Sequence, residues 1–161
     1  MKYAGIIKND FSAAPGVSTT FFTQGCPHRC KNCHNKDTWD FNGGKDFTPS
    51  VINEIIEALT ANNIKRSFCI MGGEPLCSEN ELLTLTIIKE VKNKLPNTLI
   101  YIWSGYTYEE LKNKNNNISE ILELCDYLID GPYIDELRDI TLQMRGSSNQ
   151  RIINLHEIDK K

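Results

Sequence analysis

The chain has 161 residues, of which 40% are hydrophobic and 24% are charged, and its formal net charge is −3. This length suits a single domain over residues 1–161 and leaves little room for a second one. The acidic balance argues against a nucleic-acid partner, and no apolar run reaches the roughly 18 residues of a membrane span. Residues 1–5 lack the charged start and apolar core of a signal peptide, so we expect a cytoplasmic protein.

Strands and helices are predicted to alternate along the chain. Thr- and Phe-rich residues 16–24 predict a strand, and Thr48 and Pro49 suit the start of a helix with an apolar face up to residue 59. The later elements are strands at 67–71, 98–103, 127–129 and 151–155, and helices at 79–94, 108–112 and 118–124. The polar residues 112–117 indicate a loop between two helices. This order is typical of parallel βαβ units in α/β proteins.

The predicted fold is an incomplete form of the barrel that parallel βαβ units can build. A closed barrel of eight units takes about 200 residues or more, so we expect an incomplete TIM-like barrel or open curved sheet. It should have about five or six mostly parallel strands with flanking helices. In such sheets, ligand-binding groups gather at the carboxyl ends of the strands. The motifs that follow predicted strands should therefore converge: Gly25-Cys26, Gly72-Gly73-Glu74-Pro75, Ser104-Gly105-Tyr106 and Asp130-Gly131.

Six cysteines are the most informative residues of the sequence. In a reducing cytosol a disulfide framework is improbable, which leaves core residues, metal ligands or reactive thiols. Three of them form a C-x3-C-x2-C motif: Cys26, Cys30 and Cys33. The other three are scattered: Cys69, Cys77 and Cys125. Scatter is typical of core packing, which we expect for Cys69 and Cys125, whereas Cys77 near the presumed site is a candidate for an auxiliary role.

Three thiolates on so short a loop can hold one small inorganic group. Iron–sulfur clusters are held by thiolates, ordinarily four of them, so a cluster with three would keep an iron with an open coordination position. An open coordination position allows a substrate to bind the metal, which is typical of a catalytic site and not of a structural one. A structural zinc site completed by His28 or His34 is the main alternative. A redox-active dithiol is a weaker alternative because it leaves Cys26 unused, and chance clustering is weaker still.

The other motifs also have purely structural interpretations. Two glycines and a proline suit a tight turn, although glycines equally allow a backbone to approach a ligand closely. Ser104 and Asp130 suit loops and helix caps as well as a site. Trp39 and Trp103 are more often packing residues than functional ones.

Together, the cysteine motif and Gly72-Gly73-Glu74-Pro75 resemble the pattern of radical S-adenosylmethionine enzymes. The resemblance covers nearly the whole chain and is closest to the family of activating proteins of anaerobic ribonucleoside-triphosphate reductases. The runs that carry it are residues 22–26, 35–39, 103–106, 128–131 and 145–150. The last run is the most specific, although its chemistry indicates no role.

This resemblance implies the cofactors and their ligands. Cys26, Cys30 and Cys33 would bind a 4Fe–4S cluster, whose fourth iron would chelate the amino and carboxylate groups of S-adenosylmethionine. The residues implied around the cofactor are Asn32, Cys33, His34, Gly72, Gly73, Glu74, Ser104 and Asp130. The superfamily commonly has an aromatic residue before the third cysteine, close to the adenine; Asn32 stands there, so that contact is not carried over. No catalytic residue is implied beyond the cluster and the cofactor.

An activase reaction is implied as well. A reduced cluster would give one electron to the sulfonium, and the 5′-deoxyadenosyl radical would take a hydrogen atom from a glycine of the reductase large subunit. A flavodoxin-like electron donor is implied, and an incomplete barrel would leave an open side for the protein substrate. Three alternatives stay open: an activase of the pyruvate formate-lyase type, against which residues 145–150 argue, a ferredoxin-like electron carrier, and a zinc-stabilised interaction module.

Overall fold

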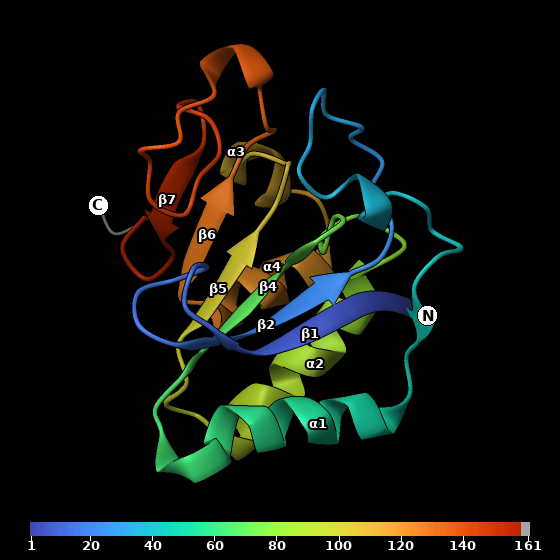
Figure 1. Ribbon diagram of the computed structural model, residues 1–161, viewed down its shortest axis with the longest axis vertical. Helices are drawn as coiled ribbons and strands as arrows, with labels where there is room; N and C mark the ends of the chain where they lie inside the picture. Colours follow the sequence, from blue (N-terminus) through green and yellow to red (C-terminus); the bar gives the residue numbers. More distant parts are fainter. Residues whose placement is uncertain (159–161) are drawn as a thin grey trace.

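Seven strands form one mixed sheet in the computed structural model, which describes residues 1–158 (Figure 1). The strands are β1 (Lys2–Asp10), β2 (Ser18–Thr23), β3 (Lys45–Asp46), β4 (Ser67–Gly72), β5 (Ile100–Trp103), β6 (Tyr127–Asp130) and β7 (Arg151–Asn154). Their order across the sheet is β3-β1-β2-β4-β5-β6-β7, so the sheet is open and not closed into a barrel. β2, β4, β5 and β6 run parallel, and the other three strands extend this centre with antiparallel pairings.

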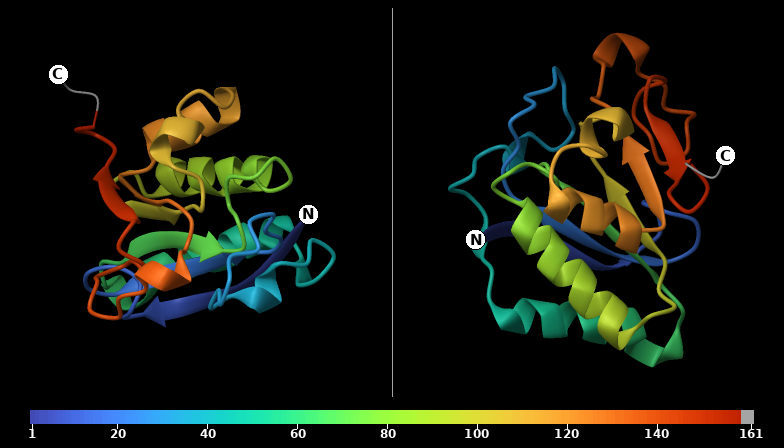
Figure 2. Two further views of the ribbon diagram at one scale, coloured as in Figure 1. Left: turned by 90° about the horizontal axis from the view of Figure 1, so that it is seen from above. Right: turned by 180° about the vertical axis from the view of Figure 1, so that it is seen from behind.

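Helices cover one face of this sheet. The described residues form α1 (Pro49–Thr60), α2 (Glu81–Lys94), α3 (Tyr108–Leu111) and α4 (Asn116–Leu124), with short 3-10 turns η1 (Lys36–Thr38), η2 (Ala61–Asn63) and η3 (Asp135–Leu137). Figure 2 shows α2 and α4 side by side across this face, and apolar residues of α1, α2 and α4 share one core with the strands. Within the described part of the chain, no helix is both long and apolar enough to cross a membrane.

The two faces of the sheet have different covers, because successive side chains of a strand point to opposite sides. Phe68 and Ile70 of β4 are fully buried in the core beneath the helices. Cys69, between them, points to the other face, where Ala13 and Ala14 of the loop after β1 pack on the sheet. The continuous apolar runs of the sequence therefore reflect burial under helices on one side and under loops on the other.

Most predicted elements are confirmed, with shifted boundaries. Thr48 is the N-cap residue of α1, as expected, but its hydroxyl pairs with Ser50 at 2.7 Å instead of capping a backbone N–H. α4 begins inside the polar stretch that was predicted as a loop. The reason is Asn115, whose side-chain oxygen accepts a hydrogen bond from the N–H of Ile118 at 2.9 Å and starts the helix.

The predicted number of strands was wrong. β1 and β3 were not predicted, so the sheet has seven strands instead of about five or six. Three of the six pairings are antiparallel, so the sheet is mixed, although the five strands β2 to β6 all run in one direction and only β1 and β7 run against them. β1 is half-exposed and ends in polar residues, so its sequence lacks the alternation of apolar and polar residues that indicates a strand. Its extended conformation is stabilised by pairing with β2.

Asp126 joins the segment after β7 to the amino end of β5. Its carboxylate accepts hydrogen bonds from the N–H of Ile100 at 2.8 Å and from His156 at 2.6 Å, and it pairs with Lys92 at 3.3 Å. Burial alone would raise the pKa of this carboxyl, but His156, Ile100 and Lys92 together lower it below 3.8. The folded-state pKa is thus lower than the unfolded-state one. The resulting stability is present above about pH 4 and is lost as the pH falls further.

We therefore expect Asp126→Asn to lower the free energy of unfolding at pH 7 by roughly 1–3 kcal/mol, as for other hydrogen bonds to charged groups. Below about pH 4 the difference from the natural chain should shrink, because the natural carboxylate is then protonated. Urea unfolding of the metal-free chain at both pH values measures this. An equal difference at both would show that Asp126 does not contribute through its charge.

Candidate functional site

One cleft is lined by the segments that follow β2, β4, β5 and β6. In Figure 1, β5 and β6 point to the top of the sheet and β2 points to the right. The walls of the cleft include Cys26, His28, Cys30 and Cys33 after β2, Gly73 and Glu74 after β4, Ser104 and Gly105 after β5, and Gly131 after β6. The predicted convergence of four separate motifs is confirmed.

The three cysteines of the motif are free thiols that face this cleft. Cys26 is buried, whereas Cys30 and Cys33 are partly exposed. Burial raises the pKa of the Cys26 thiol to about 11 and also raises the pKa of Cys30. Both thiols are therefore protonated at neutral pH in the absence of metal, and a bound metal must displace these protons.

Backbone hydrogen bonds close the base of the cysteine loop. The N–H of Gly25 donates to the carbonyl of Thr38 at 2.6 Å, and the N–H of Cys26 donates to Trp39 at 3.2 Å. Near the other end, the N–H of Asn35 points at the sulfur of Cys33 at 3.4 Å. Residues 25–39 thus form a closed loop that presents its thiols on one side.

The described residues do not form a compact site for a single ion. No three His, Cys, Asp or Glu side chains among them lie close enough together to hold one. The ring nitrogen Nε2 of His28 is 2.7 Å from Glu74, and the His34 ring lies beside Tyr133 at 5.6 Å between centroids. This arrangement does not support the zinc alternative, in which one of these histidines completes a tetrahedron. A cluster spaces its ligands more widely, because each thiolate binds a different iron.

Gly72 and Gly73 bring the end of β4 against the base of the cysteine loop. The N–H of Gly73 donates to Thr23 at 3.0 Å, and the N–H of Glu74 donates to Gly25 at 2.8 Å. A Cβ atom at Gly73 would lie 2.3 Å from the carbonyl oxygen of Gly25, so no side chain fits there. These glycines allow a close backbone approach to the cysteine loop, whereas the approach expected from the sequence was to a ligand.

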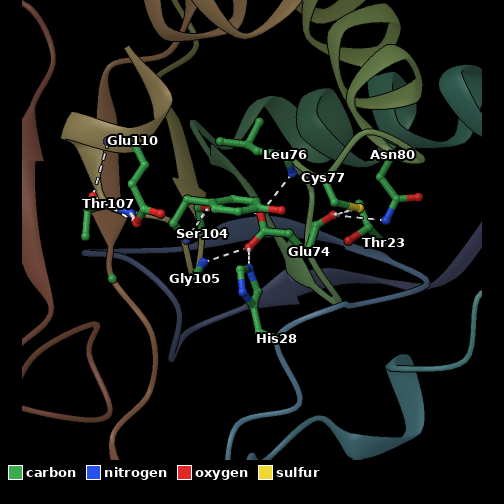
Figure 3. A network of polar contacts seen from close by, with 12 residues as sticks. Thr23, His28, Glu74, Leu76, Cys77, Asn80, Ser104, Gly105, Thr107 and Glu110 are labelled. Atoms are coloured by element: carbon green, nitrogen blue, oxygen red, sulfur yellow. Dashed lines mark hydrogen bonds and ion pairs between the residues drawn. The ribbon is translucent and has the colours of Figure 1, made fainter. Parts of the chain in front are cut away.

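Glu74 is the centre of a hydrogen-bond network (Figure 3). Its carboxylate is only 1% exposed and has four donors. Oε1 accepts from His28 and from the N–H of Gly105, both at 2.7 Å. Oε2 accepts from the Ser104 hydroxyl and from the N–H of Leu76, both at 2.9 Å. One carboxylate thereby joins the cysteine loop to the ends of β4 and β5.

Asn80 supports the same junction and was not singled out from the sequence. Its side-chain N–H groups are directed at the carbonyls of Gln24, Gly25 and Glu74, at 3.1, 3.2 and 2.9 Å. It is buried at the start of α2. An isolated asparagine before a helix carries only a capping signal, so this role could not be predicted from sequence.

Three of the predicted cofactor residues lie outside the lining of the cleft. The buried carboxylate of Asp130 pairs with Arg151 and accepts from the N–H of Tyr108 at 2.8 Å, while the next residue, Gly131, lines the cleft. Asn32 donates to Asp135 at 2.9 Å. His34 lines a neighbouring groove. By contrast, Cys33, Gly72, Gly73, Glu74 and Ser104 all line the cleft.

Residues 145–150, whose role the sequence left open, support the loop after β6. The Gln150 side chain donates to the carbonyl of Gly131 at 3.0 Å, and Asn149 donates to Pro132 at 2.8 Å. Ser147 accepts from the N–H of Ile134 at 3.2 Å. The run therefore fixes residues 131–134, and Gln150 also reaches the cleft lining.

Aromatic side chains line more of the cleft than the sequence indicated. Trp39 and Trp103, interpreted as packing residues, both face it, and so does Tyr133. The indole nitrogen of Trp39 is buried and has no hydrogen-bond partner among the described residues, whereas that of Trp103 donates to Met144 at 2.8 Å. Their positions gave a usable signal, because Trp103 ends a strand and Trp39 lies in one of the runs that carried the resemblance.

The remaining cysteines belong to the interior. Cys69 and Cys125 are fully buried, which confirms the prediction that they are core residues. Cys77 is 1% exposed and its thiol points at the carbonyl of Glu74 at 3.2 Å. Burial raises the pKa of the Cys77 thiol to about 11, so it is neither accessible nor ionised at neutral pH.

Comparison with known families agrees with this arrangement. Residues 13–153 match the model of a family described as a 4Fe–4S single cluster domain. The fold and the three-cysteine cleft thus belong to a protein of that class, with an iron–sulfur cluster as its cofactor.

Full-length relatives define the family more closely. The chain is 35% identical over 156 residues to the anaerobic ribonucleoside-triphosphate reductase-activating protein of Escherichia coli (strain K12), covering 96% of this chain and 99% of that protein. Proteins of the same name from Vibrio cholerae and Enterobacteria phage T4 are 35% and 34% identical over 153 and 152 residues, each covering 94% of this chain and respectively 97% and 93% of the relative. This chain belongs to the family of anaerobic ribonucleoside-triphosphate reductase-activating proteins. The family expected from its motifs is confirmed.

Proposed function

We propose that this protein is a radical S-adenosylmethionine activase that generates a glycyl radical on the large subunit of an anaerobic ribonucleoside-triphosphate reductase. The observation that carries the proposal is the cleft, in which three free thiols of one loop face the ends of β4, β5 and β6. The names of the relatives supply the target, because those proteins activate that reductase.

Cys26, Cys30 and Cys33 would hold the 4Fe–4S cluster. Among the described residues no fourth cysteine lines the cleft, which leaves one iron for a substrate. When bound and reduced, the cluster would supply one electron for the reductive cleavage of S-adenosylmethionine, the chemistry from which hydrogen-atom abstraction at the glycine would follow. The protein would orient the cofactor towards its substrate and exclude competing reactions.

The cofactor would lie between the cysteine loop and the strand ends. Gly72, Gly73 and Ser104 line that space, and their small size leaves backbone groups accessible. Glu74 would act by positioning its neighbours, since protein donors already use both of its oxygens. Asn32, His34 and Asp130 would contribute through their backbone or their neighbours. Aromatic faces for the adenine are available from Trp39, Trp103 and Tyr133, in place of the residue at position 32.

A groove beside the cleft supports a macromolecular substrate. It shares Met71 and Trp103 with the cleft and is also lined by Ile7 and Ile140, which are 45% and 84% exposed. Exposed apolar side chains around a groove are typical of a protein-binding surface. We take the open sheet to be a partial TIM-like barrel, whose open side admits the glycine-bearing segment of the reductase. A flavodoxin-like electron donor and a cytoplasmic location complete the proposal.

Electron paramagnetic resonance of the reductase tests the proposal directly. The reconstituted protein is incubated anaerobically with S-adenosylmethionine, a reductant and the large subunit carrying glycine deuterated at Cα. We expect a glycyl radical signal on the large subunit and deuterium in the 5′-deoxyadenosine that forms. Absence of both would overturn the proposal. A radical formed only on a pyruvate formate-lyase would favour the other activase, and cluster reduction without 5′-deoxyadenosine would favour an electron carrier.

A further inference from the structure

His28 lies within the cysteine motif, but its side chain forms a hydrogen bond with Glu74, whereas the neighbouring cysteines are free thiols. Figure 3 shows its ring directed at Glu74, and the distance from Nε2 to Oε1 is 2.7 Å. A carboxylate oxygen that already accepts from the N–H of Gly105 can only accept again, so Nε2 is the donor. The residue between the first two cysteines is thus fixed to the body of the protein.

The slot that holds this ring is shaped for it. A Cβ atom at Gly105 would lie 2.6 Å from the imidazole, so the ring occupies the space that any other residue at 105 would fill. The ring of Tyr106 meets the imidazole edge-on at 4.6 Å between centroids. Lys114 lies over the Tyr106 ring at 4.0 Å and donates to the carbonyl of Leu76 at 3.0 Å, which holds the tyrosine in place. Backbone, aromatic and carboxylate groups thus contact the imidazole from several sides, and 18% of the His28 side chain stays exposed.

The rest of the cysteine loop is attached at its base and at its far side. The base is held by the backbone bonds to residues 38 and 39 and by the bonds that Glu74 and Asn80 donate to the carbonyl of Gly25. The far side is held by the exposed bond from Asn32 to Asp135. Between these two lies the contact of His28 with Glu74, in which the imidazole is 18% exposed and the carboxylate is buried, and Glu74 also holds Ser104 and Gly105. His28 therefore contributes a side-chain link between the cysteine loop and the end of β5, because Glu74 binds Ser104 and Gly105 there.

We propose that His28 is a positioning residue: through Glu74 it sets the cysteine loop against the ends of β4 and β5, where the cofactor of the proposed function would bind. The inference rests on that function for the cofactor, but not for the attachment itself. Loss of the imidazole leaves all three thiols in place, so the cluster should still assemble. The cofactor should bind less tightly, because one of the contacts that hold the two walls of its site together is lost, although the backbone bond from Glu74 to Gly25 remains.

Three variants separate this role from general stabilisation. His28→Ala removes the attachment, and His28→Gln keeps an N–H donor that can reach a carboxylate. His156→Ala is the matched control, because His156 makes a similar bond to Asp126 at 2.6 Å on the segment after β7. Iron content, the paramagnetic resonance spectrum of the reduced cluster, and kcat and KM for 5′-deoxyadenosine formation are measured for each reconstituted protein.

We expect His28→Ala to keep its iron and to raise the KM for S-adenosylmethionine about tenfold, which is the usual scale for a hydrogen bond to a charged group, with a smaller change in kcat. The spectrum of its reduced cluster should change as well. His28→Gln should recover most of the affinity, and His156→Ala should match the natural protein in all of these measurements. Equal KM values for the two alanine variants would overturn the proposal. Loss of iron that glutamine does not restore would also overturn it, since His28 would then act as a ligand.

Trypsin digestion of the metal-free chain tests the attachment without any cofactor. Arg29 and Lys31 are exposed cleavage sites on the cysteine loop. Cleavage after them should be about tenfold faster in His28→Ala, because local opening becomes easier, and should return towards the natural rate in His28→Gln. Unchanged cleavage would overturn the proposal. If the natural protein failed to cleave S-adenosylmethionine, the proposed function would fail while this digestion still decided the role of His28.

Discussion

Replacing Cys30 by alanine should abolish cluster binding. A reconstituted natural chain is expected to hold about four iron atoms and to be brown, and the variant should hold almost none. In the proposed function the cluster is held by the thiolates of Cys26, Cys30 and Cys33, and the remaining two should not retain it. Iron and sulfide analysis, together with the visible absorption spectrum of anaerobically reconstituted protein, measures the effect. Formation of 5′-deoxyadenosine should be lost in parallel.

Cys125→Ala is the matched control for this variant. Cys125 is fully buried in the core beneath the helices, away from the cleft. Its replacement should lower the free energy of unfolding by roughly 1 kcal/mol through the small cavity it leaves, and iron content should not change. Iron and colour that persist in Cys30→Ala would show that the ligand assignment is wrong. Iron lost from both variants would show that the cleft depends on the whole fold more than on one ligand.

Gly73→Ala should have the second largest effect. The added Cβ would lie 2.3 Å from the carbonyl oxygen and 2.8 Å from the carbonyl carbon of Gly25, and neither backbone can move without breaking the bonds that join them. Relief of the clash requires the end of β4 to separate from the cysteine loop, with loss of the 2.8 Å bond from Glu74 to Gly25. We expect about 3 kcal/mol of destabilisation and more than a tenfold loss of S-adenosylmethionine affinity.

Urea unfolding of the metal-free protein and cofactor titration of the reconstituted protein measure these two effects. Gly5→Ala is the control, since a Cβ atom at Gly5 has no neighbour within 4 Å. It should leave both quantities close to those of the natural chain. A Gly73→Ala variant with natural stability would mean that the contact between the two loops relaxes at little cost, and the cleft would then be less rigid than its geometry indicates.

The location of the site could be predicted because it depends on strand direction alone. Parallel strands end at the same edge of a sheet, so residues 26, 73, 104 and 131 had to meet once the strands before them were recognised. The division of the cysteines into a cluster motif and core residues likewise followed from spacing. Both conclusions needed the order of elements and no knowledge of side-chain directions.

Side-chain directions could not be predicted in this way. Asp130 ends a strand like the other site residues, yet its carboxylate faces Arg151 and the start of α3 because successive side chains of a strand alternate between faces. Glu74 suggested a cofactor ligand, but its partners come from residues up to 46 positions away. β1 was missed for a related reason: its order comes from pairing with β2 and not from its own residues.

The ring of His28 occupies the space that a side chain at position 105 would need. Substitutions at the two positions should therefore be correlated in evolution. A lineage that replaces the histidine by a smaller residue frees room at position 105, and one that first gains a side chain at 105 must displace the ring. Substitutions at these two sites, 77 residues apart in the numbering of this chain, should therefore be inherited as pairs. If the cysteine loop were grafted onto another protein, His28, Glu74 and Gly105 would have to be grafted together with it.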